Sequence, residues 1–293
     1  MQTGIYRHMP KAWHPYMQLA RIDRPIGSWL LFLPCLWGMA LAQGSDIGQN
    51  ILWVALFAVG SLIARSAGCV WNDFADRDFD KRVARTASRP LASGVLQRSH
   101  AIFFLIGLLL LCFVIFAWAN IWARWLLIAS IPLVLAYPFM KRITYWPQLW
   151  LGLTFNWGVL VAYAQMADAW PNMAALCLYG CGVFWTLGYD TIYAHQDIAD
   201  DLIIGVKSTA IKFGDKSTFF VMGFYAVALI MLGTALYVAQ KLVFWALLAV
   251  PLFAWQFYRL DLQNPLSCLR TFRNNRFIGM GIALVVLLAG IYG

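Results

Sequence analysis

The chain has 293 residues, of which 62% are hydrophobic and only 12% are charged, and its formal net charge is +9 at pH 7. This composition is far more apolar than that of a soluble domain, and it excludes an ordinary water-soluble enzyme. The basic excess does not indicate a nucleic-acid-binding protein, because the chain has no basic motif interleaved with aromatic residues. In an apolar chain, an excess of basic residues indicates how the loops are distributed between the two sides of a membrane.

Residues 11–24 mix aromatic and charged side chains, so we expect 1–24 to form an interfacial amphipathic segment. Nine later stretches are apolar and long enough to cross a bilayer as helices. They are residues 25–43, 51–71, 101–119, 123–140, 147–166, 172–192, 218–239, 241–258 and 276–293. The sequence therefore predicts an all-α polytopic membrane protein with nine transmembrane helices, in which residues 1–293 form a single domain.

Lysine and arginine are distributed very unevenly between the two sides of this arrangement. Twenty of the 22 fall on the side that receives the N-terminus and the long loops 72–100 and 193–217, and only Arg124 and Lys241 fall on the other. By the positive-inside rule, the N-terminus is cytoplasmic and the C-terminus is outside. Because both long loops also carry most of the aspartates, we expect the functional site at the cytoplasmic mouth.

The end of the second span carries an acidic cluster. On a helix, Asn72, Asp73, Asp76 and Asp80 lie within about 100° of arc, and Asp78 lies off that face. Like charges at this spacing repel each other unless a cation compensates them. Because all the side-chain ligands are oxygens, the cluster predicts a Mg²⁺–diphosphate site at the membrane surface.

A second acidic cluster follows the sixth span. We expect Asp190, Asp197 and Asp201 on one helix face, because separations of 7 and 11 residues return almost to the same angle. The spacing of Asp197 and Asp201 repeats that of Asp76 and Asp80 four spans earlier, which indicates two four-helix pseudo-repeats followed by a last helix. Two facing carboxylate pairs at the interface between the halves can bind two Mg²⁺ ions bridged by a diphosphate.

Cations close to both clusters are candidate ligands for the diphosphate. Arg65 lies two turns before Asn72 on the same face, inside an otherwise apolar span, and a charge in that position indicates function. The other candidates for substrate binding are Arg24, Asn72, Arg89, Tyr137, Lys141 and Lys207.

The chain closely resembles the UbiA-type intramembrane prenyltransferases over essentially its whole length. The motifs that carry this resemblance are Arg21–Gly27, Arg65–Asp80, Tyr137-Pro138 with Lys141, and Tyr189–Asp201. The opening Asp-Arg-Pro-Ile-Gly and the Tyr-Asp-Thr stretch select the hydroxybenzoate branch, as found in bacterial ubiquinone biosynthesis.

This resemblance implies helices around a central cavity, with a lateral opening through which the prenyl tail reaches lipid. It implies that Asn72, Asp76, Asp80, Asp197 and Asp201 hold Mg²⁺ and the diphosphate. The implied reaction transfers a polyprenyl group from polyprenyl diphosphate to the 3-position of 4-hydroxybenzoate and releases diphosphate, as a membrane step of ubiquinone biosynthesis. The implied location is the bacterial inner membrane.

Several roles in this reaction stay open at the level of sequence. The guanidinium of Arg65 suits the acceptor's carboxylate and the diphosphate equally. The aromatic face of Tyr137 can stabilise an allylic cation. Asp190 or Asp73, or the diphosphate itself, can accept the proton that the ring loses.

Two alternative functions remain. The first is a prenyltransferase for another aromatic acceptor, such as a naphthoate, homogentisate or haem. The second is a cation-coupled secondary transporter, which intramembrane aspartates would serve. Against a transporter, the aspartates are predicted at one membrane face and not at the midplane.

Overall fold

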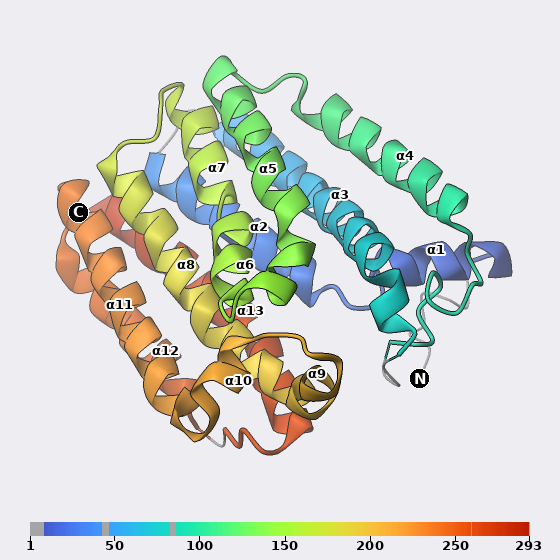
Figure 1. Ribbon diagram of the computed structural model, residues 1–293. Helices are drawn as coiled ribbons and strands as arrows, with labels where there is room; N and C mark the ends of the chain where they lie inside the picture. The colour runs from blue at the N-terminus through green and yellow to red at the C-terminus, as the bar shows by residue number, and fades with distance from the viewer. Residues whose placement is uncertain (1–8, 43–46, 83–85, 259, 293) are drawn as a thin grey trace.

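The computed structural model describes residues 9–42, 47–82, 86–258 and 260–292, and the regular elements within these ranges are all helices (Figure 1). The longer helices are α2 (Ile26–Ala42), α3 (Ile47–Asp80), α4 (Arg98–Phe116), α5 (Ile121–Ile143), α8 (Met173–Ala194), α11 (Ser217–Val238) and α13 (Pro265–Tyr292). The shorter ones are α1 (His14–Leu19), α6 (Pro147–Phe155), α7 (Gly158–Ala167), α9 (Ile198–Ile204), α10 (Thr209–Phe213) and α12 (Val250–Trp255). Short 3₁₀ segments are η2 (Lys11–Trp13), η3 (His195–Asp197), η4 (Gly214–Lys216) and η5 (Val243–Ala249). The predicted all-α class is confirmed.

Five helical stretches in the described ranges are long and apolar enough to cross a membrane, which agrees with a polytopic protein. They are α3, α4, α5, α13 and the run Thr209–Val238 that contains α10 and α11, while α2 and Val243–Trp255 are shorter apolar helices. The count of nine crossing helices is not confirmed. Residues 1–8 of the predicted interfacial segment and the ends of the predicted first and last spans, 43 and 293, lie outside the described residues.

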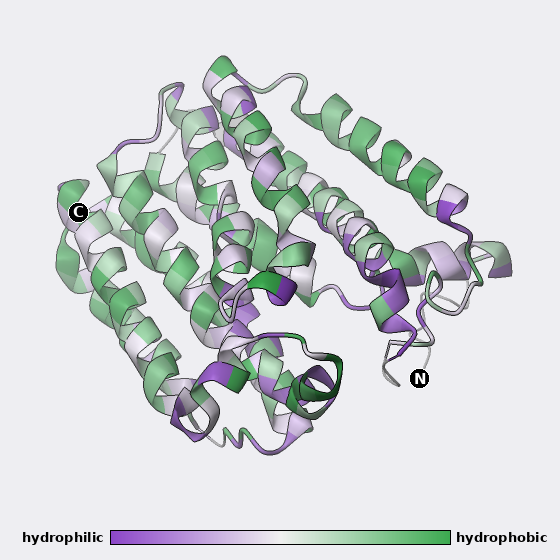
Figure 2. Ribbon diagram, viewed as in Figure 1, coloured by the Kyte–Doolittle hydropathy of each residue, from purple (hydrophilic) through white to green (hydrophobic). Residues whose placement is uncertain are grey.

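Hydrophobic residues predominate along the helices, α4 above all, and hydrophilic residues gather at one end of the bundle (Figure 2). On α4, which packs on α3 at the edge of the molecule, Phe103 is 73% exposed and Phe113 is 72% exposed. Exposure of large apolar side chains to this extent suits a surface that faces lipid tails and not water.

The largest core surrounds α8, which packs against α2, α11 and α13. Trp37 of α2 and Trp185 of α8 are fully buried with ring centroids 5.2 Å apart, and the indole of Trp37 donates to the carbonyl of Gly279 in α13 at 2.8 Å. The close approach of α8 and α11 needs a glycine, because a Cβ on Gly188 would lie 2.0 Å from the ring of Tyr225. Small residues at helix contacts serve the same purpose in other membrane bundles.

Prolines at positions 132 and 138 lie inside α5, where each removes one backbone donor. Three indole N–H groups from outside α5 donate to its carbonyls, and these contacts attach neighbouring segments to this proline-containing helix. The donors are Trp157 to Leu126 at 2.8 Å, Trp150 to Leu133 at 2.7 Å and Trp71 to Leu135 at 3.2 Å.

Three predicted continuous helices are broken, among them the eighth predicted span, 241–258, which consists of the 3₁₀ segment η5 and the short helix α12. The fifth predicted span is two short helices, α6 and α7, that meet at Asn156. The segment from Asp190 to Asp201, predicted as one helix, is interrupted by the 3₁₀ turn η3, so a single helix face through Asp190, Asp197 and Asp201 is wrong. A 3₁₀ turn advances three residues per turn, which changes the angular relation that an α-helix would give.

Candidate active site

The acidic cluster stays helical to the end of α3, as its spacing predicted. Asp73, Asp76 and Asp80 are 2%, 0% and 6% exposed, whereas the side chain of Asp78 is 66% exposed. The one carboxylate that periodicity placed off the common face therefore points to solvent. Burial of three carboxylates within eight residues requires cations, because an unpaired buried charge is very costly.

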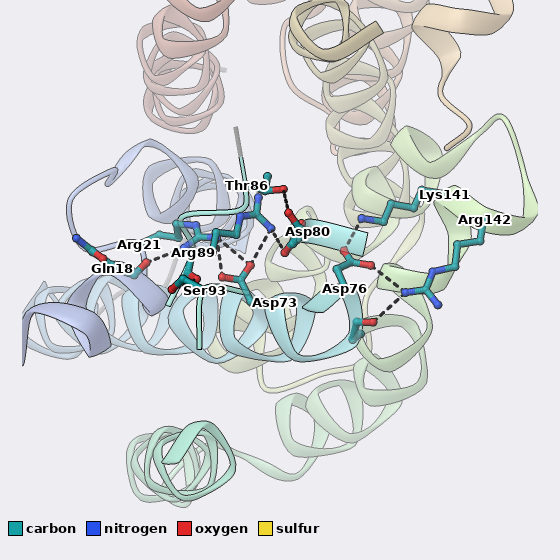
Figure 3. A network of polar contacts seen from close by, with 11 residues as sticks. Gln18, Arg21, Asp73, Asp76, Asp80, Thr86, Arg89, Ser93, Lys141 and Arg142 are labelled. Carbon is teal, nitrogen blue, oxygen red and sulfur yellow. Dashed lines mark hydrogen bonds and ion pairs between the residues drawn. The ribbon is translucent and has the colours of Figure 1, made fainter. Parts of the chain in front are cut away.

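Two arginines from outside the helix neutralise Asp73 and Asp80 (Figure 3). Arg21 donates to both carboxylate oxygens of Asp73 at 2.8 Å. Arg89 lies between the two acids, and its Nη1 donates to Asp73 at 3.0 Å and to Asp80 at 2.7 Å. Thr86 completes this part of the network by donating its hydroxyl to the backbone carbonyl of Asp80 at 2.9 Å.

Asp76 has a separate set of partners, which come from the end of α5 (Figure 3). Lys141, at the end of α5, forms an ion pair with it, and Arg142 donates to its Oδ1 at 3.0 Å. Arg142 also donates to the carbonyl of Ala75 at 2.9 Å and lies over the ring of Phe79 at 4.3 Å. Asp76 thus fastens the end of α3 to the end of α5.

A polar cavity of about 200 Å³ opens between these helix ends, α8 and α9. It brings together nine of the predicted site residues from segments that are far apart in sequence. They are Asn72, Asp80, Arg89, Tyr137, Lys141, Asp190, Asp197, Asp201 and Lys207. Carboxylate, amide, phenol and cationic groups therefore share one small space, and both acidic clusters contribute to it despite the break at η3.

Four predicted site residues do not line this cavity. Asp73 and Asp76 are buried behind it in their ion pairs. Arg24 is largely exposed, with 67% of its side chain accessible, and lies 3.4 Å from Asp23. Arg65 lies deeper in α3 with its guanidinium 5.5 Å from the ring centre of Phe155, and its buried Nε has no hydrogen-bond partner among the described residues.

Several residues of the site were not predicted, among them Asp200, which also lines the cavity. Arg21 pairs with Asp73, while Gln148 and Tyr193 line the cavity. Gln148 accepts a hydrogen bond from the backbone N–H of Thr209 at 3.1 Å, which docks the segment that carries Lys207. The sequence contains only a weak signal for Arg21. This residue stands in the Arg-Ile-Asp-Arg stretch, which we interpreted as part of the interfacial segment.

Electrostatics differ between Arg89, which lines the cavity, and His195 of the turn η3. Burial opposes the charge of Arg89, but the carboxylates of Asp73 and Asp80 more than offset this, so the pKa of its guanidinium is raised. Burial lowers the pKa of His195 despite the nearby charge of Asp215, so its ring is neutral near pH 7. Arg89 is therefore the permanent cation of this pair.

The donor set fits a hard divalent cation that also has a phosphate ligand. No three His, Cys, Asp or Glu side chains in the described ranges lie close enough together to enclose an ion by themselves. Mg²⁺ does not need such a cage, because it typically keeps waters and binds one or two carboxylates together with substrate phosphates. The carboxylate and amide side chains that line the cavity offer oxygen ligands, so the chemistry of these residues is compatible with Mg²⁺.

Comparison with known proteins gives the family. Residues 31–284 match the family described as the UbiA prenyltransferase family. The chain belongs to this family. It is 42% identical over 295 residues to the Bos taurus protein named 4-hydroxybenzoate polyprenyltransferase, mitochondrial, covering 99% of this chain and 79% of that protein. The Drosophila melanogaster protein of the same name is 43% identical, over 98% of this UbiA-family chain and 74% of its own length.

Solved structures show the same UbiA fold. A UbiA homologue from Aeropyrum pernix superposes with a TM-score of 0.72 at 23% identity, covering 89% of this chain and 97% of that one. A homologue from Archaeoglobus fulgidus, described as bound to GPP and Mg²⁺, superposes with a TM-score of 0.66 at 17% identity, over 93% of this chain and 99% of that one.

The predicted location in a bacterial inner membrane, with a cytoplasmic active site, is wrong. The similar curated relatives are named as mitochondrial proteins, in Bos taurus, Homo sapiens and Drosophila melanogaster alike. The charge bias separates two sides of a membrane, and the aspartate motifs describe a site, so neither feature identifies the membrane.

Proposed function

We propose that the protein transfers a polyprenyl group from polyprenyl diphosphate to the 3-position of 4-hydroxybenzoate, releasing diphosphate, as a membrane step of ubiquinone biosynthesis. The observation that carries this proposal is the similarity, at 40–44% identity and over nearly the whole chain, to proteins named 4-hydroxybenzoate polyprenyltransferase. The cavity of carboxylates and cations at one end of an apolar bundle supports it, because such a site suits a diphosphate attached to a lipid tail.

Mg²⁺ is the proposed cofactor of this reaction. Asn72 and Asp80 on one wall, and Asp197 and Asp201 on the other, would hold it with the diphosphate, and Asp76 is the further candidate behind them. When bound, Mg²⁺ supplies Lewis-acid neutralisation of charge on the diphosphate. The Archaeoglobus fulgidus homologue described as bound to GPP and Mg²⁺ supports this assignment.

Cations of the cavity wall assist departure of the diphosphate. Arg89, Lys141 and Lys207 are positioned to bind diphosphate oxygens, and fixed cations of this kind stabilise charge as it builds in the transition state. The allylic carbon becomes positive as its bond to oxygen breaks. The electron-rich face of Tyr137, on the same cavity wall, stabilises that charge.

The acceptor is proposed to occupy the deeper end of the site. Three cations lie at the level of the carboxylates, whereas Arg65 lies two helical turns deeper beside Phe155. This separation favours pairing of Arg65 with the acceptor's carboxylate, which matches a guanidinium in a bidentate manner. The ring carbon ortho to the hydroxyl attacks the allylic carbon, and Asp190 or the departing diphosphate takes the ring proton.

The test is product analysis with defined substrates. Purified protein in lipid nanodiscs is supplied with geranyl diphosphate, Mg²⁺ and either 4-hydroxybenzoate, a dihydroxynaphthoate or homogentisate, and the products are identified by mass spectrometry. We expect geranyl-4-hydroxybenzoate from the first mixture and no product from the others. A product from another acceptor, with none from 4-hydroxybenzoate, would refute the proposed acceptor.

A further inference from the structure

Asp73 is a buried carboxylate to which the proposed reaction gives no direct part. It is 2% exposed and does not line the cavity, so it cannot reach a bound substrate without breaking its ion pairs. Its two partners are both arginines, and they come from different parts of the chain. A group in this position acts through its neighbours.

Arg89 is the neighbour that reaches the cavity. Its Nη1 is shared between Asp73 at 3.0 Å and Asp80 at 2.7 Å, and the residue lines the cavity wall (Figure 3). Asp80 belongs to the proposed metal ligands. An arginine held by Asp80 alone would lose its partner whenever that carboxylate turned to a cation, whereas Asp73 continues to hold it.

Arg21 fixes Asp73 from the other side. Its Nη2 donates to both carboxylate oxygens at 2.8 Å, and its Nη1 donates to the carbonyl of Gln18 in α1 at 2.7 Å. The backbone of Arg21 has a φ of +55°, in the left-handed region that non-glycine residues rarely adopt. Such a conformation persists where surrounding contacts determine it.

We propose that Arg21 and Asp73 form a positioning pair that holds the guanidinium of Arg89 against the cavity for diphosphate binding. The pair also joins the α1 segment to the end of α3, so the entry to the first apolar helix and the diphosphate site share one ionic network. Asp73 is then a positioning residue and not the acceptor of the ring proton. The inference rests on the proposed function for the identity of the diphosphate.

The primary test is Asp73→Asn, which keeps the shape of the side chain and removes its charge. We expect the KM for geranyl diphosphate and the Kd for inorganic diphosphate with Mg²⁺, measured by isothermal titration calorimetry, each to rise about 10- to 100-fold. The KM for 4-hydroxybenzoate should stay within about twofold. Asp78→Asn is the matched control, because it makes the same change on the same helix at an exposed carboxylate, and both constants should be unchanged.

A double-mutant cycle tests whether Asp73 acts through Arg89. In an Arg89→Gln background, adding Asp73→Asn should weaken diphosphate binding no further, because the positioned group is already absent. A proton acceptor would behave differently: its loss would lower kcat at constant KM, and it would do so in both backgrounds. That result would overturn the positioning role.

Arg21→Lys is a second variant in case Asp73→Asn does not fold. It keeps the positive charge but loses the planar fork that contacts both Asp73 and Gln18. We expect inorganic diphosphate binding to weaken in the same direction but less than for Asp73→Asn, and unchanged binding in a folded Arg21→Lys protein would overturn the proposal. Because this readout needs no acceptor, a wild-type protein that binds diphosphate but does not prenylate 4-hydroxybenzoate would refute the proposed function alone.

Discussion

The three buried carboxylates of α3 share one helix face but have different partners. Asp73 has Arg21 and Arg89, and Asp80 shares Arg89 while it reaches the cavity. Asp76 is bound by Lys141 and Arg142 from α5. The three side chains are chemically identical, but their partners give them different roles. Asp73 positions an arginine, Asp76 links two helices and Asp80 lines the cavity.

Removing the charge of Asp76 should affect both stability and catalysis. Asp76→Asn leaves Lys141 and Arg142 with an amide in place of a fully buried carboxylate, and breaking a buried pair in this way costs about 3 kcal/mol. We expect a lower unfolding midpoint by calorimetry and turnover reduced at least about 100-fold. Asp78→Asn, at an exposed position, should change stability by less than about 0.5 kcal/mol. Wild-type turnover in a folded Asp76→Asn protein would contradict this.

Gly27 of α2 should control the position of Arg65. A Cβ at this glycine would lie 2.4 Å from Nε of Arg65, so Gly27→Ala must displace the guanidinium. We expect the KM for 4-hydroxybenzoate to rise about 10- to 100-fold, because small misplacements of a binding group have effects of this size. Gly107→Ala is the control, since its Cβ meets no atom within 4 Å.

The same experiment separates the two roles that the sequence left open for Arg65. If Arg65 binds the acceptor, Gly27→Ala leaves the Kd for inorganic diphosphate unchanged. A rise in that Kd together with an unchanged KM for 4-hydroxybenzoate would assign Arg65 to the diphosphate instead.

At the residue scale, spacing predicted orientation but could not predict partners. Helical periodicity alone separated Asp78 from the other acids, because 100° per residue is a local property of the backbone. Arg21 lies 52 positions from Asp73, and Lys141 lies 65 positions from Asp76, so these two pairings depend on how helices pack. Arg21 was missed for this reason.

At the scale of elements, neither the break between α6 and α7 nor the break at η3 contains a proline, although Gly158 begins α7 directly after the first break. The junction of α6 and α7 is at Asn156-Trp157, and η3 consists of His195, Gln196 and Asp197. Both breaks are stabilised by tertiary contacts, which local propensity does not contain. Hydropathy predicted where the chain is apolar enough to cross a membrane, and it could not show where a crossing helix is interrupted.

The first of these breaks depends on the side chain of Asn156, which is fully buried. Its Nδ2 donates to the carbonyl of Gly152 and to the hydroxyl of Thr186 in α8, both at 2.8 Å. Asn156→Ala should lower the free energy of unfolding by about 1–2 kcal/mol. Chemical denaturation of the detergent-solubilised protein measures this.

A double variant tests whether the hydrogen bond between Asn156 and Thr186 accounts for this loss of stability. Thr186→Val should lose part of the same free energy, and Asn156→Ala with Thr186→Val should lose less than the sum, because the two residues share a hydrogen bond. Thr234→Val is the control, since this hydroxyl donates within its own helix, to the carbonyl of Ile230. Strict additivity would mean that this contact does not hold the break.

At the scale of the whole molecule, the site is assembled from the charged ends of several helices. The first acidic cluster and the second one, 121 residues later, approach each other because α3 and α8 end on the same side of the bundle (Figure 1). Charge asymmetry predicted that common side correctly, since it depends on loop composition and not on packing. It could not predict the compartment, which a membrane-side rule does not describe.

Removing divalent cations should abolish the reaction without unfolding the protein. In EDTA we expect no detectable prenylation and a large loss of affinity for inorganic diphosphate, both restored by excess Mg²⁺, because the wall cations Arg89 and Lys141 are already engaged by carboxylates. Those same ion pairs neutralise Asp73, Asp76 and Asp80, so the unfolding midpoint should change by less than about 3 °C, or roughly 1 kcal/mol. Undiminished turnover in EDTA would show that the protein cations alone support departure of the diphosphate, and it would remove the metal from the mechanism.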